Sequence, residues 1–345
     1  MPAKIIIRAP NHLGDCVMAL PTIDHAREAH PGAEVHLLVS TALSELFAGN
    51  PSLDNLIAIP PEHIHGWLSV FKIRDLLSPH DFDIGYVLPP SFGAASGFKL
   101  AGVRERIGYV TDGRRLLLTK PLPPPVPSNS VHRSEGFFNL LRRGSGIDFD
   151  FVRPKLFLSD DDIVAAEPLL QPFGIDAQRP YVAVSHRAVA ESRRWGFERY
   201  VELIKQIVSR HGLKVVLIGT DEDRRSGEDI VSQAGQGQVV NLCGRTGLRQ
   251  LAAILSRARL FVGNDSGPAH LAAAVGAELV VLSGADDPAE TSPLTPRKHL
   301  IYRDRLPCIS CVKNKCPLTG RDHMRCMREI TVDMVAGEVD AALAG

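Results

Sequence analysis

Short apolar runs alternate with longer amphipathic stretches along almost the whole chain. The first run, KIIIRA at residues 4–9, is too short for a helix and has the composition of a buried strand. In the first half, the expected strands are residues 4–9, 35–39, 56–59 and 84–88, and the expected helices are residues 15–29, 67–77 and 137–143. Alternation of this kind predicts a parallel sheet with helices on both faces.

A proline-rich segment, PLPPPVP at residues 121–127, interrupts this pattern and is excluded from a helix or a central strand. The alternation restarts beyond it. Expected strands cover 181–185, 214–219, 239–242, 260–263 and 278–282, and expected helices cover 200–209, 224–233, 248–256, 268–275 and 332–343. We therefore predict two Rossmann-like α/β domains, residues 1–175 and 176–345, in which the last helix is free to pack back on the first domain.

Ligands of open α/β sheets bind beyond the carboxyl ends of the strands. The functional side chains are therefore expected directly after strands, around a cleft between the two domains.

Composition and charge narrow the class of partner. The 345 residues include 39 Lys or Arg and 39 Asp or Glu, with 44% hydrophobic residues. Such a chain buries a core, is not disordered, and lacks the basic excess of a nucleic-acid-binding protein. Basic residues are nevertheless clustered locally, with nine Lys or Arg against three Asp or Glu between positions 297 and 329. An anionic small ligand is compatible with that distribution.

Several sequence signals are missing. No apolar run reaches 18 residues and no secretory leader is recognisable, so we expect a cytoplasmic protein with its six cysteines reduced. The first strand is not followed by Gly-x-Gly-x-x-Gly, and no Gly-Lys pair occurs. This disfavours a nicotinamide-dependent dehydrogenase and a P-loop NTPase.

The motif NHLGD directly follows the first expected strand. Gly14 permits a tight turn beside Asn11 and His12, and Asp15 falls near the start of the next helix. Asn11, His12 and Gly14 are candidates for acceptor contacts or for the turn itself. A carboxylate there is either a helix N-cap or a general base that faces the cleft.

The motif GNDSGPAH opens the helix after the strand at residues 260–263. Free amides and the positive end of that helix suit a phosphate or diphosphate, with Asp265, Ser266, Gly267 and His270 as candidate contacts. The alternative is an ordinary helix cap with a structural histidine.

Two further loops follow strands of the second domain. Arg193 and Arg194 either stabilise a departing diphosphate or belong to a solvated basic loop. Asp221 and Glu222 either accept hydrogen bonds from ribose hydroxyls or cap the next helix.

The tail carries Cys308, Cys311, Cys316 and Cys326 with the spacing C-x2-C-x4-C-x9-C. Four thiolates satisfy tetrahedral zinc, and an iron–sulfur cluster is a second possibility. The third interpretation is four buried thiols without metal.

Taken in order, the HLGD motif, the PPSF segment at residues 89–92, the RRW segment and GNDSGPAH resemble glycosyltransferase family 9, the ADP-heptose:lipopolysaccharide heptosyltransferases. The resemblance covers nearly the whole chain. The cysteine-rich tail ending in HMRCM is similar to that of heptosyltransferase II members.

The resemblance implies a GT-B fold with an N-terminal acceptor domain and a C-terminal donor domain. It implies inverting transfer of L-glycero-D-manno-heptose from ADP-heptose to the lipopolysaccharide inner core, with no cofactor and no catalytic metal. Asp15 matches the general base. Arg193 stands where the family usually has a lysine, with Arg194 as its rival, and Asp221, then Glu222, matches the ribose contact. The remaining donor signature falls on Asp265, Ser266, Gly267 and His270.

The implied partners are a nucleotide-sugar donor and a lipid-borne core acceptor at the inner face of the inner membrane, without nucleic acid. Three alternatives stay open at this point: transfer of another nucleotide sugar, epimerase chemistry on the same fold, and a metal-stabilised binding protein without catalysis. The oligomeric state is not indicated by the sequence.

Overall fold

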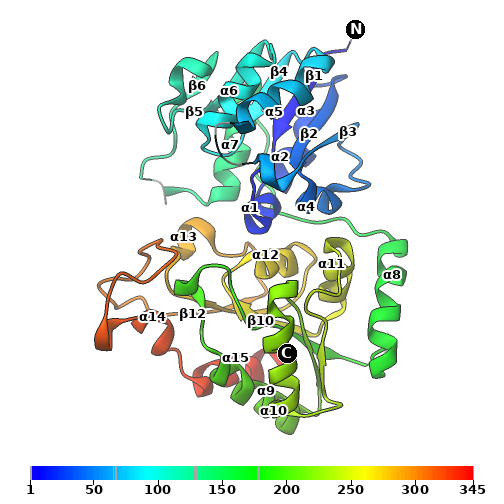
Figure 1. Ribbon diagram of the computed structural model, residues 1–345, viewed down its shortest axis with the longest axis vertical. Helices are drawn as coiled ribbons and strands as arrows, with labels where there is room; N and C mark the ends of the chain where they lie inside the picture. The colour runs from blue at the N-terminus through cyan, green and yellow to red at the C-terminus, as the bar shows by residue number, and fades with distance from the viewer. Residues whose placement is uncertain (1, 65, 67, 128–129, 177–178, 345) are drawn as a thin grey trace. The chain divides into compact units, whose positions relative to one another are not determined.

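The computed structural model describes residues 2–64, 66, 68–127, 130–176 and 179–344. The chain forms two compact units, residues 1–154 and 155–345. Each unit is built on its own sheet with helices packed against it (Figure 1).

The first unit contains a parallel sheet in the order β3-β2-β1-β4-β5-β6. Its strands are β1 (Lys4–Arg8), β2 (Glu34–Ser40), β3 (Asn55–Ile59), β4 (Ile84–Val87), β5 (Glu105–Tyr109) and β6 (Lys120–Leu122). Its α-helices are α1 (Leu13–Met18), α2 (Leu20–Asp24), α3 (Ala26–Ala29), α4 (Thr41–Ser44), α5 (Leu68–Leu77), α6 (Phe92–Leu100) and α7 (Arg133–Ser145). Short 3-10 turns are η1 (Glu45–Phe47), η2 (Pro61–His63), η3 (Ser78–His80) and η4 (Arg114–Leu117).

The four strands expected in this unit are confirmed, and β5 and β6 were missed. The strand β6 is short and begins the proline-rich segment, with Pro121 inside it. Because β6 is at the edge of the sheet, the missing N–H of Pro121 is tolerated there.

The single helix expected over residues 15–29 is wrong. The chain instead forms α1, α2 and α3, and α2 has Pro21 in its first turn. A proline removes one helical hydrogen bond and its ring clashes with the preceding turn, so a continuous helix is interrupted there. The apolar periodicity survives the breaks, which is why the pattern suggested one helix.

The expected helix over residues 67–77 is observed as α5, and Trp67 lies outside the described residues. The helices α5 and α6 approach closely because Gly97 has no side chain. A β-carbon at that position would lie 2.6 Å from Cγ2 of Ile73.

The second unit repeats this topology with the sheet order β12-β11-β10-β7-β8-β9, again parallel. Its strands are β7 (Tyr181–Ser185), β8 (Lys214–Leu217), β9 (Val239–Asn241), β10 (Leu260–Asn264), β11 (Leu279–Ser283) and β12 (Lys298–Tyr302). Its α-helices are α8 (Asp160–Leu170), α9 (Phe197–His211), α10 (Arg224–Ala234), α11 (Leu248–Arg257), α12 (Gly267–Ala274), α13 (Pro288–Thr291), α14 (Arg325–Arg328) and α15 (Val332–Ala344). Its 3-10 turns are η6 (Gln171–Phe173), η7 (Glu191–Arg193), η8 (Asp221–Asp223) and η9 (Gly320–Asp322).

The division between the units falls at residue 154, before the expected boundary at 175. The reason is α8, which packs against α11 of the second unit. Arg249 on α11 binds Asp162 on α8 with its Nε 2.7 Å from the carboxylate Oδ1. The last helix, α15, packs on α9 and on strands β10 to β12 of its own unit.

The core of the second unit explains why the RRW segment carries a tryptophan. Trp195 is buried, donates from its indole N–H to the carbonyl of Ile330 at 2.7 Å, and meets Tyr200 edge-on at 5.0 Å between ring centroids. This residue anchors the loop after β7, so that the arginines just before it are held in a defined place.

In both sheets the strand order reverses direction in the middle, between β1 and β4 in the first and between β7 and β10 in the second. Crevices for ligands form at such switch points.

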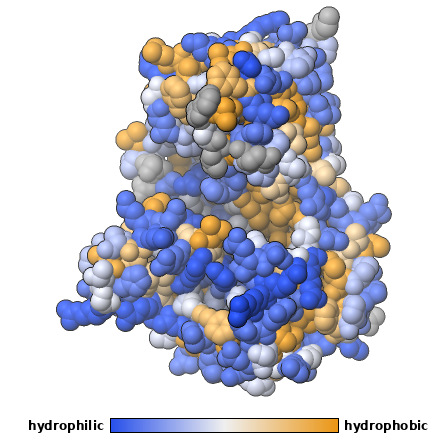
Figure 2. All heavy atoms as spheres, in the orientation of Figure 1, coloured by the Kyte–Doolittle hydropathy of each residue, from blue (hydrophilic) through white to orange (hydrophobic). Residues whose placement is uncertain are grey.

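On the face seen in Figure 2, hydrophilic and hydrophobic residues are interspersed in both units. Among the described helices, none is long and apolar enough to cross a membrane.

Candidate active site

Asp15 lies in the first turn of α1, which follows β1 at the switch point of the first sheet. The N-cap of α1 is His12, whose side chain makes no capping hydrogen bond. Asp15 is three residues further along, with 20% of its side chain exposed. It is therefore not the N-cap that its sequence position allowed.

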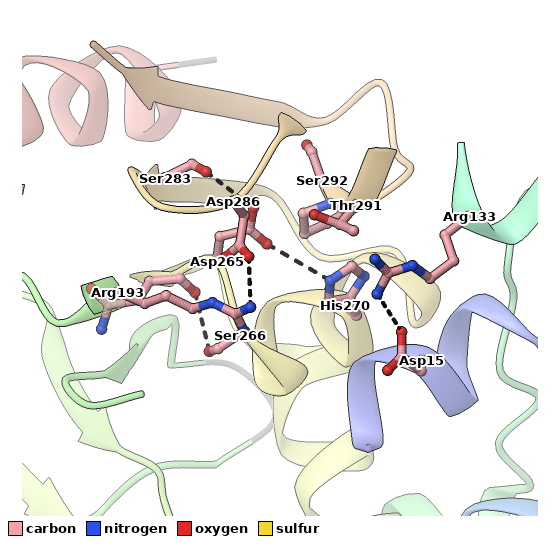
Figure 3. Close-up of polar contacts among 12 residues, drawn as sticks. Asp15, Arg133, Arg193, Asp265, Ser266, His270, Ser283, Asp286, Thr291 and Ser292 are labelled. Carbon is pink, nitrogen blue, oxygen red and sulfur yellow. Dashed lines mark hydrogen bonds and ion pairs between the residues drawn. The ribbon is translucent and has the colours of Figure 1, made fainter. Parts of the chain in front are cut away.

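An ion pair orients this carboxylate. Arg133 lies with its Nη1 3.0 Å from Oδ1 of Asp15 (Figure 3). Arg133 begins α7, and the next residue, Ser134, donates from its Oγ to the carbonyl of Met18 at 2.6 Å. The two helices thus fix both partners of the ion pair. Sequence reasoning missed Arg133 because it is 118 residues from Asp15 and no local motif marks it.

Local contacts hold the rest of the NHLGD turn. The side-chain oxygen of Asn11 accepts a hydrogen bond from the guanidinium of Arg8, which also donates to the carbonyl of Ala9 at 2.5 Å. Arg8 is buried, and this burial lowers its pKa to about 10. His12 is exposed and Gly14 lies in the first turn of α1. Asn11 therefore satisfies a buried cation, whereas His12 faces solvent.

In the second unit, the polar residues predicted from GNDSGPAH come together at the start of α12, at the switch point of the second sheet (Figure 3). Two side chains that sequence reasoning did not select join them from the end of β11 and the segment after it. The cluster consists of Arg193, Asp265, Ser266, His270, Ser283 and Asp286.

Asp265 is the most buried acid of this cluster, with 3% of its side chain exposed. Its Oδ2 accepts a hydrogen bond from Ser283 at 3.2 Å, and its Oδ1 lies 3.7 Å from Nε2 of His270. Burial, with a smaller contribution from the neighbouring Asp286 carboxylate, raises the pKa of Asp265 to about 7. The site is therefore able to hold a proton near neutral pH.

The two candidate arginines have different roles. Arg193 reaches Asp286, with its Nη2 2.6 Å from Oδ1 of that carboxylate. Arg194 turns back on its own loop and donates to the carbonyls of Ala188 at 2.8 Å and Val189 at 3.2 Å. Only Arg193 belongs to the cluster, and Arg194 braces the loop that presents it.

The start of α12 is open to an anion. Ser266 occupies the N-cap position but makes no capping hydrogen bond, because its Oγ donates to the carbonyl of Asn264 at 3.2 Å. Gly267 begins the helix, and His270 lies buried in its first turn. Pro268 has no N–H, and the N–H of Ala269 donates to the carbonyl of Ser266 at 3.0 Å. The helix start therefore offers its positive end and the N–H of Gly267 to a ligand such as a diphosphate.

Asp221 and Glu222 are both exposed at the start of η8, beyond the end of β8. The local capping interaction is made by Asp223, which accepts hydrogen bonds from the N–H and Oγ of Thr220 at 2.9 and 3.0 Å. Asp221 pairs with Arg224 at 2.7 Å. The side chains of Asp221 and Glu222 therefore take no part in this capping interaction. Their contact with a ribose stays a prediction.

The four tail cysteines are free and partly buried, three in the loop before α14 and one on that helix. The Sγ of Cys316 accepts a hydrogen bond from the N–H of Met324 at 3.3 Å. Burial raises the pKa of Cys326, with smaller contributions from the other three thiols. Within the described part of the chain, no group of three or more His, Cys, Asp or Glu side chains is arranged to hold a metal ion.

With this geometry established, comparison with known proteins identifies the family. The model of glycosyltransferase family 9 (heptosyltransferase) matches residues 70–321. The chain belongs to this family. It is therefore a glycosyltransferase, and the prediction of an α/β GT-B protein with two Rossmann-like units is confirmed.

Relatives match over nearly their whole length. Lipopolysaccharide heptosyltransferase 2 of Escherichia coli is 27% identical over 310 residues, covering 86% of this chain and 87% of the relative. Lipooligosaccharide heptosyltransferase 2 of Haemophilus ducreyi is 25% identical over 354 residues, covering 99% of both. The solved E. coli ADP-heptose lps heptosyltransferase II superposes with a TM-score of 0.80 at 25% identity, covering 99% of this chain and 98% of that one.

Proposed function

We propose that this family 9 glycosyltransferase moves L-glycero-D-manno-heptose from ADP-heptose to the lipopolysaccharide inner core, with inversion at the anomeric carbon. The support is twofold. Relatives that span nearly the whole chain are named heptosyltransferase 2 and act on lipopolysaccharide or lipooligosaccharide. In addition, both switch points carry the side chains that such a transfer needs.

The second unit is the proposed donor-binding unit. The observation that carries this assignment is the uncapped start of α12, with Arg193 and His270 beside it. In our proposal the diphosphate of the donor binds at Ser266 and Gly267, and Arg193 stabilises the charge that develops as ADP leaves. Asp265 and His270 contact the sugar end of the donor, and Asp221 or Glu222 binds the ribose.

The first unit is the proposed acceptor-binding unit, and Asp15 is the proposed general base. The base removes the proton from an acceptor hydroxyl, whose oxygen then attacks the anomeric carbon as the bond to the diphosphate breaks. The ion pair with Arg133 supports this assignment because it gives the carboxylate a fixed direction without burying it. The proton ends on Asp15, and the negative charge leaves with ADP.

We further propose that the protein acts in the cytoplasm at the inner face of the inner membrane, where a lipid-borne acceptor is accessible. Binding to liposomes that contain anionic lipid would support this location. Absence of binding to both neutral and anionic liposomes would contradict it. The proposed reaction requires no metal, and stoichiometric metal in purified active protein, lost together with activity on chelation, would contradict that part.

The central test is an ADP-release assay with ADP-heptose and lipopolysaccharide acceptors of graded core length. Asp15→Ala should lower turnover by roughly 100- to 10,000-fold, the usual contribution of a well-placed general base. Calorimetry should find ADP binding nearly unchanged, because Asp15 belongs to the proposed acceptor unit. Glu28→Gln, an exposed acid on the neighbouring α3, is the matched control and should behave like the parent.

Turnover of Asp15→Ala close to that of the parent would exclude Asp15 as the base. Calorimetry of the parent with ADP, UDP and GDP tests the donor separately. A preference for UDP would count against ADP-heptose.

A further inference from the structure

Arg193 and Asp286 come from loops that follow two different strands, β7 and β11. In the sheet order, β10 lies between these strands, and β10 leads into Asp265 and the start of α12. The ion pair between Arg193 and Asp286 therefore spans the end of β10, over the segment that opens the proposed diphosphate site (Figure 3).

Burial makes this ion pair more than a surface contact. The side chain of Asp286 is 7% exposed and that of Arg193 is 33% exposed. The Nε of Arg193 is buried and has no hydrogen-bond partner in the described part of the structure. The guanidinium is thus held through Nη2, while another of its donors is left without an acceptor.

We propose that Asp286 is a positioning residue, which holds the Arg193 guanidinium beside the start of α12 so that its remaining N–H groups receive the diphosphate of the donor. This inference rests on the proposed function, from which it takes the identity of the ligand. An ionised carboxylate has no proton to donate to a phosphate oxygen. The ion pair with Arg193 is the contact through which we expect Asp286 to favour an anionic ligand.

The choice of arginine fits this role. A guanidinium is a planar fork with five donors, so it can bind a carboxylate with one nitrogen and a phosphate with the others in a fixed geometry. A lysine ammonium is a single point charge on a flexible chain. Paired with Asp286, it would be drawn away from the ligand.

Simple electrostatics makes the opposite prediction, and this makes the proposal testable. Asp286 adds a negative charge to a cluster that already holds Asp265, with Arg193, His270 and Lys298 as the nearby cationic or titratable groups. If Asp286 acted only through its charge, its removal would strengthen the binding of an anion. If it positions Arg193, its removal weakens that binding.

The experiment measures the dissociation constant of ADP by calorimetry for the full-length parent, Asp286→Asn, Asp286→Glu, Arg193→Ala and the double variant Asp286→Asn/Arg193→Ala. If the parent binds UDP or GDP more tightly, that nucleotide replaces ADP throughout. We expect Asp286→Asn to weaken binding about 10-fold or more, as loss of one oriented charge-assisted contact does. Asp286→Glu should recover part of the loss. The double variant should bind no more weakly than Arg193→Ala alone, because both changes remove the same contact.

The matched control is Asp287→Asn. It removes one negative charge from the adjacent residue, whose side chain caps α13 by accepting from the N–H of Ala289 at 3.0 Å. Asparagine is as good an N-cap as aspartate, so this variant should fold and bind ADP like the parent. Circular dichroism and thermal melting confirm that each variant is folded. Should Asp286→Asn fail to fold, Asp286→Glu and Arg193→Lys carry the comparison, and both should bind more weakly than the parent.

Binding by Asp286→Asn as tight as the parent's, or tighter, would overturn the proposal. So would fully additive losses in the double variant, or a parent that binds none of the three nucleotides. A different result would contradict the proposed function. If ADP binding responds as expected but ADP-heptose is not turned over, the positioning role stands and the assigned reaction does not.

Discussion

At the scale of single residues, the candidate donor site is organised by acids whose surroundings differ. Asp265 and Asp286 are buried in one cluster, whereas Asp221 is 79% exposed and paired with Arg224. The sequence suggested that Asp265 and Asp221 belong to the same site. The structure distinguishes them by burial: the buried carboxyl of Asp265 can hold a proton, whereas that of Asp221 lies in solvent. Their different environments lead to a prediction about pH.

Asp265 should make the protein less stable as the pH rises from about 4 to about 7. Its pKa is about 7 in the folded state and 3.8 as the ordinary value, so across this interval the folded state keeps a proton that the unfolded chain has released. Above about pH 7 this loss of stability is complete. Between pH 5 and pH 8, the parent should lose about 1 to 3 kcal/mol more unfolding free energy than Asp265→Asn, which cannot titrate.

Urea unfolding of both proteins at the two pH values measures this difference. Asp304→Asn, a change at an exposed acid, is the control and should follow the parent. If the parent and Asp265→Asn changed equally between pH 5 and pH 8, Asp265 would not be protonated in the folded state.

At the scale of elements, hydrophobic periodicity predicted most strands and helices. Three of the errors lie where prolines occur within or beside an element. The pattern over residues 15–29 indicated one helix because its apolar spacing continues through α1, α2 and α3. The strand β6 was missed because prolines hide a short edge strand. The helix α8 was not predicted because prolines also punctuate its surroundings, and Pro168 lies inside it.

The anchoring of α8 leads to a prediction about stability. Asp162 closes the capping box at the start of α8 with Ser159, and it binds Arg249 on α11. Asp162→Ala should lower the unfolding free energy by about 2 to 4 kcal/mol, because it removes a cap and takes the carboxylate away from the largely buried guanidinium of Arg249. The hydrogen bond from Arg249 also lowers the pKa of Asp162, so this contribution is present above about pH 4 and is lost as the pH falls.

Asp161→Ala is the matched control, since Asp161 is exposed in the same helical turn. It should change stability by no more than about 0.5 kcal/mol. Equal denaturation midpoints for the two variants would mean that α8 is not anchored through Asp162.

At the scale of the whole molecule, the chain repeats one topology twice. Each unit has its own sheet of six parallel strands with the same order of strands and its own buried residues. Units of this size with their own cores are expected to fold independently. The proposed donor residues all belong to the second unit, which leads to a prediction about fragments.

Residues 155–345, produced alone, should fold and bind ADP with an affinity within about tenfold of the full chain, and should show no transferase activity. Circular dichroism and calorimetry measure the two properties. A fragment of residues 176–345, cut at the boundary that the sequence suggested, lacks α8 and should melt at a lower temperature. A fragment 155–345 that is folded but does not bind ADP would contradict the assignment of this unit to the donor.

The sequence by itself determined the alternation of strands and helices, the two Rossmann-like units, and the placement of NHLGD and GNDSGPAH directly after strands. These properties follow from local hydrophobic periodicity and from glycine and proline, whose effects reach only a few residues along the chain. The tertiary structure decided which side chains meet. It paired Arg133 with Asp15 and Asp286 with Arg193, because these contacts depend on which helix ends and strand ends become neighbours. Sheet order sets those neighbours, and it is fixed by packing between segments that are distant in sequence.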